Sequence, residues 1–158
     1  MNFLNVENIK MDTSGRAIFF DVSSCTLGNI YLQSGTDGTS RGQREQYSSE
    51  VLPQLLVNSQ ECGTIGGDFN CILDKEDCTR YPESKMSPSL KRLVRTFSLK
   101  DSFRTMHPEV KTYSRFYERN GEGASRIDRS YNWGNIRVLE ASYIAVAFSD
   151  HLGYVVKI

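Results

Sequence analysis

Three short polar motifs in this sequence carry side chains that can perform hydrolytic chemistry. The motifs are GGDFN, SRID and SDH, and together they contain Asp68, Asn70, Asp128, Asp150 and His151. Carboxylates hold divalent cations or orient water, an amide can hold a phosphate oxygen, and an imidazole can move a proton or balance charge. These groups are the inventory for metal-assisted attack of water on a phosphodiester.

Asp68 and Asn70 flank Phe69 at the end of a segment with the composition of a buried strand. On an extended chain, residues two apart share one face, so both polar side chains point the same way and Phe69 points to the other side. The preceding Gly-Gly pair permits a close approach of the backbone. A purely structural interpretation of this motif is an Asp/Asn turn at the end of a strand, and an Asp-x-Asn motif taken alone favours that interpretation.

His151 directly follows Asp150. Neighbours on an extended segment point to opposite sides, so a different carboxylate must pair with the imidazole, and Asp128 is the natural candidate. Such a partner fixes the tautomer of the ring. The interpretation without function is a satisfied surface or core histidine, which is how we interpret His107 beside Pro108.

The three motifs, in this order, resemble the endonuclease/exonuclease/phosphatase superfamily, and within it the endonuclease domain of LINE-type retrotransposons. The resemblance covers residues 15–158. It implies a mixed α/β fold, a four-layer α/β/β/α sandwich of the DNase I-like type. It also implies Mg²⁺ or Mn²⁺ as cofactor and DNA as the substrate, nicked to leave a 3′-hydroxyl. A nuclear location and a reverse transcriptase domain in the parent element are further implications.

The resemblance also implies a role for each matching residue. Asp68 would position or deprotonate the attacking water, and Asn70 would hold that water and the scissile phosphate. Asp128 would pair with His151, which would stabilise the transition state. Metal ligands would be Asp150, Asp68 and Asn70. Substrate contacts would come from the following residues: Tyr31, Asn70, Thr112 and Arg126.

The sequence departs from the family pattern in two places. The family's first strand carries an Asn and a following segment a Glu that binds metal, and neither has a match upstream of Gly15. The family's tyrosine is followed by a small residue, Pro and Asn, whereas Tyr31 is followed by Leu-Gln-Ser. We therefore expect residues 1–158 to be roughly the C-terminal two-thirds of one such domain, incomplete at its N-terminal side and impaired in activity.

Two alternative functions fit the same motifs. One is a phosphatase or phospholipase of the same superfamily, acting on inositol phosphates or lipids, which are also anionic substrates. The other is a non-catalytic remnant of a retrotransposon. The SRID motif and the overall spacing favour the nuclease.

Composition narrows these choices. With 158 residues, 39% of them hydrophobic and 24% charged, the chain has the size and balance of one folded domain. No apolar run approaches the ~20 residues of a membrane span, and no secretory signal is recognisable, so we expect an intracellular protein. Residues 1–79 carry 5 Lys/Arg against 11 Asp/Glu, whereas residues 80–137 carry 13 against 6. This basic segment suits a polyanionic substrate, although a solvated helix face explains it equally well.

The cysteines suggest no special chemistry. Their spacing includes no C-x-x-C pair, which argues against a structural zinc site. We expect reduced thiols that serve as small, buried apolar residues. The four positions are Cys25, Cys62, Cys71 and Cys78.

Hydrophobic periodicity predicts two helices and several strands. The first helix is capped by Thr39 or Ser40, runs to about Asn58 and is kinked or split at Pro53. The second is capped by Ser87. We expect a loop over 74–88. The predicted strands cover 17–22, 27–31, 62–69, 112–117, 125–131, 138–147 and 153–158.

Overall fold

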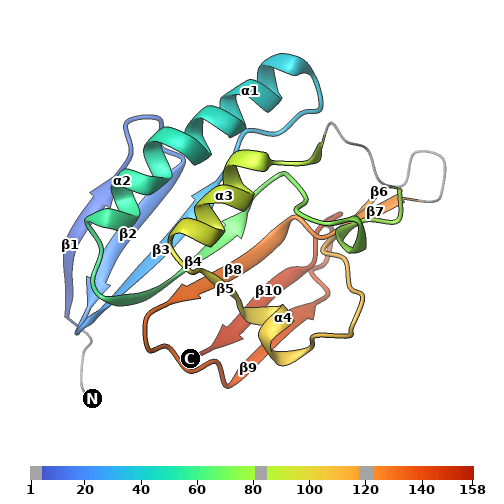
Figure 1. Cartoon of the computed structure of the whole chain (residues 1–158). Coiled ribbons are helices and arrows are strands. Elements are labelled where there is room, and N and C mark those ends of the chain that lie inside the picture. Colours follow the sequence, from blue (N-terminus) through green and yellow to red (C-terminus); the bar gives the residue numbers. More distant parts are fainter. Residues whose placement is uncertain (1–4, 81–84, 118–122) are drawn as a thin grey trace.

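A six-stranded mixed sheet forms the centre of the computed structural model, which describes residues 5–80, 85–117 and 123–158 (Figure 1). Only the pair β3–β4 is parallel, and the other neighbours are antiparallel. In spatial order the strands are β1 (Val6–Met11), β2 (Ala17–Val22), β3 (Cys25–Tyr31), β4 (Cys62–Asp68), β8 (Asp128–Trp133) and β5 (Lys100–Asp101).

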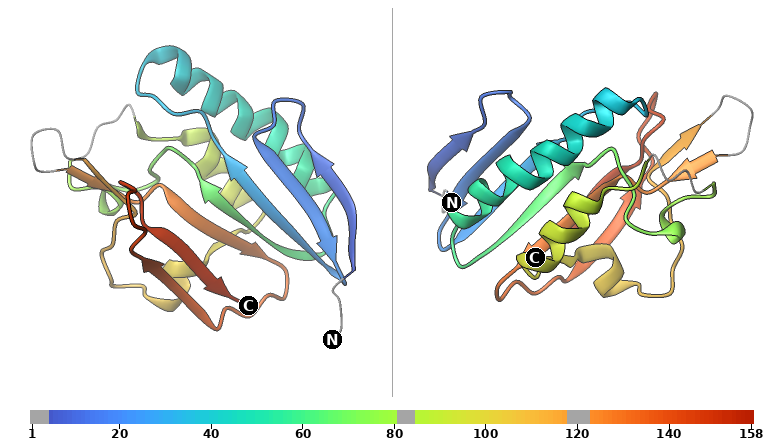
Figure 2. Two further views of the ribbon diagram at one scale, coloured as in Figure 1. Left: turned by 180° about the vertical axis from the view of Figure 1, so that it is seen from behind. Right: turned by 45° about the horizontal axis from the view of Figure 1, so that its top comes forward.

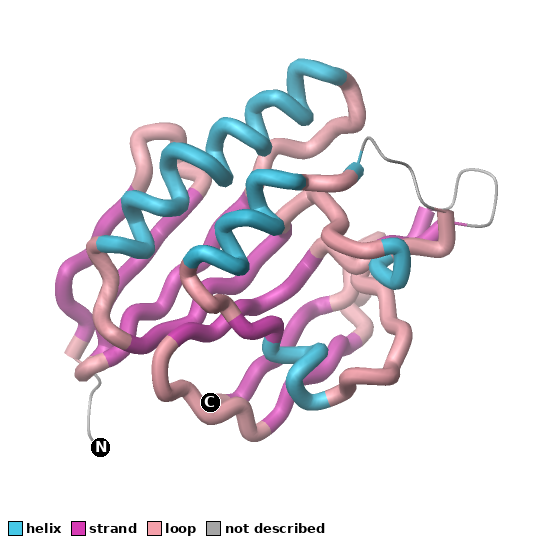
Figure 3. Tube along the Cα trace, in the orientation of Figure 1, coloured by secondary structure: helices cyan, strands magenta, loops and turns pink. Residues whose placement is uncertain are grey.

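The parallel pair needs a crossover, and a long helical segment supplies it (Figure 3). It consists of α1 (Gly38–Gln46), a π-helical turn (Tyr47–Val51) and α2 (Leu52–Val57). The backbone stays helical from α1 to α2, and the predicted interruption takes the form of this π turn, which lies directly before the turn that holds Pro53. The predicted cap is wrong. Asp37 caps the helix, with its carboxylate accepting the Ser40 N–H at 2.9 Å.

The second helix, α3 (Pro88–Thr96), begins as predicted, with the Ser87 hydroxyl accepting the Leu90 N–H at 3.1 Å. All three helical segments lie over one face of the sheet (Figure 1). Between them and the sheet lies the main core, in which inward side chains of alternate strand positions meet the apolar stripes of the helices. Its fully buried members include Phe19, Ile30, Leu52, Ile65, Leu90 and Tyr131.

The opposite face of the sheet is partly covered by a second, two-stranded sheet, β9 (Glu140–Ile144) and β10 (Gly153–Lys157), as the view from behind shows (Figure 2). A hairpin of β6 (Arg115–Tyr117) and β7 (Gly123–Ser125) extends from one end. The described residues thus form helix, sheet and second-sheet layers of the predicted sandwich. A second outer helical layer is not seen in that part of the chain.

Sequence patterns missed three elements and lengthened others. The edge strand β1, the two-residue strand β5 and α4 (Ser102–Met106) were not predicted. The predicted strand over 125–131 is interrupted, because β7 ends at Ser125 and β8 begins at Asp128. The predicted loop over 74–88 contains a short 3₁₀ helix, Lys75–Asp77, and its residues 81–84 lie outside the described part.

A buried ion-pair network holds this interruption in place. The carboxylate of Asp77 is 2.9 Å from Arg126 Nε and 3.3 Å from a terminal guanidinium nitrogen of Arg129. Arg126 has a second carboxylate partner, Asp101, whose Oδ2 lies 2.8 Å from Arg126 Nη1. Burial alone would raise the pKa of Asp77, but the guanidinium groups of Arg129 and Arg126 outweigh it and lower that pKa to about 2.

Replacing Asp77 should therefore destabilise the fold and remove part of its acid sensitivity. Asp77→Asn leaves the buried Arg129 without its carboxylate partner and Arg126 with Asp101 alone, and we expect a loss of about 3–5 kcal/mol in the free energy of unfolding at pH 7. Because the folded pKa is depressed, the native carboxylate contributes fully above about pH 4 and its contribution is lost as pH falls toward 2. Urea unfolding between pH 3 and pH 7 measures both effects.

The matched control is Glu76→Gln, at a half-exposed carboxylate 4.0 Å from Lys75. It should change stability by less than about 0.5 kcal/mol. An equal loss in both variants would contradict a special role for the Asp77 network.

Candidate active site

Strand register brings three predicted site residues side by side. In the parallel ladder Tyr31 pairs with Asp68, and in the antiparallel ladder Asp68 pairs with Asp128. Directly paired residues share one face of a sheet. The last residues of β3 and β4 and the first residue of β8 therefore form one row at the end of the sheet.

His151 reaches this row from the segment before β10. Its Nδ1 lies 2.9 Å from the Asp128 carboxylate, as the sequence predicted. The backbone carbonyl of Asp150 accepts the Phe116 N–H at 3.0 Å, which fastens the SDH segment to β6. Both side chains of the pair are partly exposed to solvent.

The surroundings of Asp68 disfavour its ionised form and raise its pKa. Burial raises its pKa to about 6, and the neighbouring charge of Asp128 adds to this, while the Asn70 backbone N–H, at 2.8 Å from the carboxylate, and His151 oppose it. A carboxylate with a pKa near neutrality is suited to accept a proton from water.

The GGDFN turn that carries Asp68 has a constrained backbone. Gly67 has φ 138°, and a Cβ there would lie 1.9 Å from the Ile30 carbonyl oxygen, so the predicted close approach is confirmed. Asn70 has φ 47° and its side-chain amide donates to the Leu32 carbonyl at 2.8 Å. Phe69 is buried and packs edge-on against Tyr131, with ring centroids 5.3 Å apart.

Three of the site's side chains could hold a cation together. One ligand atom each of Asp68, Asp128 and His151 lies within 4.8 Å of the others. The carboxylate oxygens of this set suit a hard divalent cation. Asp150, the predicted ligand, instead pairs with Arg115 at 3.0 Å, and its ligand role stays a prediction.

Ser114 is a site-organising residue that the sequence did not reveal. Its buried hydroxyl accepts the backbone N–H groups of Ile127 at 2.9 Å and of Asp128 at 3.0 Å. Its carbonyl accepts the Leu152 N–H at 2.6 Å. One residue thus ties the strand of Asp128 to the segment of His151. The predicted substrate contact of Thr112, two residues earlier, stays a prediction.

The predicted phosphate contact of Arg126 is wrong. Its side chain is 4% exposed and is engaged with Asp77 and Asp101 beneath the site. A guanidinium without access to solvent cannot meet a phosphate backbone, so Arg126 shapes the SRID turn instead. Arg129 is also fully buried, and the basic segment is therefore partly structural.

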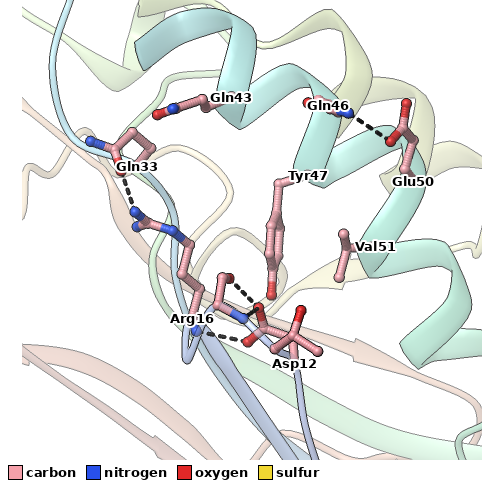
Figure 4. A pocket seen from close by; sticks show the side chains of 10 residues that line it. Asp12, Arg16, Gln33, Gln43, Gln46, Tyr47, Glu50 and Val51 are labelled. Atoms are coloured by element: carbon pink, nitrogen blue, oxygen red, sulfur yellow. Dashed lines mark hydrogen bonds between the residues drawn. The ribbon is translucent and has the colours of Figure 1, made fainter. Parts of the chain in front are cut away.

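One hollow adjoins the row, and a second lies elsewhere along the sheet. A groove of about 410 Å³ runs over the helix-free face of the sheet, with Asp68 and Asp128 at its lining and β10 as one wall. A polar pocket of about 560 Å³ lies between the β1–β2 turn and the crossover helix (Figure 4). In it Arg16 donates to Gln33 and also lies 5.9 Å from the centre of the Tyr31 ring.

The sequence could not reveal the supporting residues. Asp77 and Arg126 are 49 positions apart, and Ser114 precedes Asp128 by 14. Their partners are chosen by the fold, and no spacing rule announces them. By contrast, His107 was correctly set aside, since its Nε2 lies 3.1 Å from the Ala141 carbonyl in a structural contact.

Comparison with solved structures identifies the fold. The 3′ phosphatase NExo from Neisseria, bound to product DNA hairpin, superposes with a TM-score of 0.79 at 20% identity, covering 98% of this chain and 71% of that one. An AP endonuclease from Archaeoglobus fulgidus gives 0.79 at 16% identity, with the same coverages. The chain therefore has the DNase I-like fold that these two enzymes share.

A sequence relative is more specific. Over 129 residues the chain is 35% identical to the uncharacterized 149 kDa protein of transposon TX1 from Xenopus laevis. The match covers 79% of this chain and 10% of that protein, so the chain spans about a tenth of its relative. No protein-family model matches the sequence. The chain thus shares its fold with solved DNA-processing enzymes and is similar in sequence to part of a transposon protein.

The raised pKa of Asp68 generates a prediction about stability. The folded state binds the carboxyl proton more tightly than the unfolded chain, so stability falls as pH rises from about 4 to 6. In metal-free buffer, Asp68→Asn should raise the free energy of unfolding at pH 7 by about 1–2 kcal/mol, and by much less at pH 4. Urea unfolding at both pH values measures the difference.

Asp150→Asn is the matched control, at an exposed carboxylate whose pKa is lowered, chiefly by its hydrogen bond with Arg115. It should not stabilise the protein at either pH. A destabilised Asp68→Asn variant at pH 7 would contradict the assignment of strain to Asp68.

Proposed function

We propose that this chain is the catalytic part of a metal-dependent endonuclease that nicks DNA and leaves a 3′-hydroxyl. The observation that carries the proposal is the cluster of Asp68, Asp128 and His151 at the end of the sheet. A superfamily fold alone would not suffice, since one fold hosts several activities. The cluster brings together a partly buried carboxylate, a histidine paired with a second carboxylate, and ligand atoms that could hold a cation.

The chain's own residues divide the work. Asp68 orients the attacking water and accepts its proton. Asp128 accepts the Nδ1–H of His151 and fixes the orientation of the ring. The other ring nitrogen is then directed to the phosphate. Asn70 keeps its amide oxygen for water or phosphate, because the amide nitrogen is committed to Leu32. Preorganised donors of this kind act where negative charge develops.

The oxygen donors of Asp68 and Asp128 would hold Mg²⁺ or Mn²⁺, with Asp150 as a further ligand if it exchanges Arg115 for the cation. When bound, the cation would supply charge neutralisation at the phosphate. Because Mg²⁺ demands near-octahedral oxygen coordination, water or substrate oxygens would complete the set of ligands.

An exposed aromatic residue supports DNA over a small phosphate ester. Phe148, three residues before His151, is fully exposed and has φ 62°, a conformation that bulky residues rarely adopt. An exposed aromatic side chain on the segment that carries His151 can stack on a nucleobase. A small inositol phosphate offers no such planar surface.

The biological setting belongs to the proposal as well. The relative is a transposon protein about ten times longer than the matched part. We infer a parent element in which a reverse transcriptase domain uses the 3′-hydroxyl left by the nick, which places the activity in the nucleus. No helix in the described part of the chain is long and apolar enough to span a bilayer.

Nicking of supercoiled plasmid tests the function. With Mg²⁺ the chain should produce open circles, EDTA should stop it, and Asp68→Ala and His151→Gln should each lower the rate by at least about 10²-fold. The control is His107→Gln, at the histidine outside the site, which should keep the rate. Unchanged nicking by Asp68→Ala, or an intact plasmid together with hydrolysis of an inositol phosphate or of neither substrate, would contradict the proposal.

Phe148 gives a separate test. Phe148→Ala should raise the KM for DNA by about 5-fold or more, since stacking on one base contributes about 1–3 kcal/mol. Hydrolysis of bis(p-nitrophenyl) phosphate should be unchanged, because that substrate needs only the catalytic groups. The control Val57→Ala removes another exposed apolar side chain and should alter neither. Equal losses on both substrates would show that Phe148 supports the site's structure instead.

A further inference from the structure

Two cysteines face each other at the end of the sheet opposite the active site. Cys25 begins β3 and Cys62 begins β4, and they are direct partners in the parallel ladder. Their sulfur atoms lie 2.8 Å apart. Both residues are partly exposed, whereas the other two cysteines, Cys71 and Cys78, are buried. The expectation of four buried, apolar cysteines is therefore wrong for this pair.

A metal does not explain the pair. A thiolate zinc site needs four ligands, or three with an open position. Among the described residues, Asp68, Asp128 and His151 are the one group of three or more with ligand atoms close enough to share an ion. The pair at the other end has no third ligand in that part of the chain.

The sulfur contact is instead close to what a covalent bond requires. Paired residues of adjacent strands have Cα separations of about 5 Å, within the ~4.4–6.8 Å that disulfides span. The sulfur atoms would have to approach by less than 1 Å to reach the ~2.05 Å of a bond. No strand needs to shift register for this.

We propose that Cys25 and Cys62 are a disulfide-forming site that reacts with a small disulfide oxidant such as glutathione disulfide. One thiolate attacks the oxidant, forms a mixed disulfide and releases one glutathione thiolate, which takes up a proton. The second thiolate then attacks the cysteine sulfur of the mixed disulfide and releases the second glutathione. The two cysteines are oxidised, and one glutathione disulfide is reduced to two glutathiones.

The disulfide would link the two ends of the β3–helix–β4 crossover covalently. The two cysteines are 37 positions apart, and the whole helical connection from β3 to β4 lies between them. Closing a loop of this length restricts the unfolded chain and stabilises the fold. The other ends of the same strands carry Tyr31 and Asp68. The disulfide would therefore stabilise the two strands that position these residues without contacting the residues themselves.

The local electrostatics set the conditions for the reaction. The hydrogen bond with Cys25 and burial raise the pKa of Cys62 to about 11. Since the thiolate is the nucleophile, attack by Cys62 should accelerate as pH rises.

The experiment is native oxidation of the chain with excess glutathione disulfide at pH 8.5, followed by intact mass and peptide mapping. We expect the loss of two hydrogen atoms, a Cys25–Cys62 cross-linked peptide, a Tm rise of about 5 °C or more that dithiothreitol reverses, and an unchanged nicking rate. Cys25→Ser and Cys62→Ser, which keep the size and fold, should each lose the cross-link and the Tm rise. Cys25→Ala is the second variant should a serine perturb the strand.

Three results would overturn the proposal. The first is a stable glutathione adduct on Cys25 or Cys62 without a cross-link. The second is a cross-link that involves Cys71 or Cys78. The third is a protein that keeps four free thiols after prolonged exposure to the oxidant. Each is visible by mass, and none depends on the nuclease activity, so failure here leaves the proposed function untouched.

Discussion

The register of three strands is the constraint on which the site depends. Tyr31, Asp68 and Asp128 come from distant parts of the chain and are neighbours only because β3, β4 and β8 pair as they do. That pairing is fixed by the core, since a slip of one residue would turn Ile30, Ile65 and their neighbours away from the helices. Burial of the helix-facing side of the sheet therefore determines where the carboxylates lie.

The position of Asp68 in the site is electrostatically unfavourable for its ionised form. Asp68 is partly buried beside Asp128, and both desolvation and the like charge raise its pKa. The Asn70 backbone N–H and the imidazole of His151 offset only part of this. Strain of this kind persists where the surrounding structure leaves no alternative. Here Ser114 and the Asp77 network supply that rigidity. Ser114 accepts the backbone N–H of Asp128, and Asp77 holds Arg126 and Arg129, which flank Asp128 in the sequence.

Much of this arrangement was predictable from the sequence, and the remainder has a common cause. Local signals succeeded where the determinant is local. Ser87-Pro88 predicted the start of α3, Pro53 predicted the interruption of the crossover helix, and Gly67 predicted a close backbone approach. The pairing of Asp128 with His151 also followed, because only a separate carboxylate could reach the ring. The paired residues lie 23 positions apart.

Predictions failed where the partner is distant and chosen by packing. Arg126 looked like a phosphate contact, but a buried Asp77 claims its guanidinium. Cys25 and Cys62 gave no motif because a parallel ladder, and not a spacing, brings them together. The strand predicted over 125–131 breaks at Arg126-Ile127 because burying two guanidinium groups beside Asp77 requires the chain to leave the sheet there.

Arg115 links the β6–β7 hairpin to the chemistry at the end of the sheet. Its side chain holds Asp150 at 3.0 Å, and its backbone bridges to His151 in the same antiparallel contact. One residue of the hairpin therefore touches both members of the Asp150–His151 pair. A cation that recruits Asp150 must compete with the Arg115 guanidinium, whereas a phosphate that attracts Arg115 would release Asp150 toward the cation. Substrate and metal would then favour each other's binding, because each removes the partner that restrains the other's ligand.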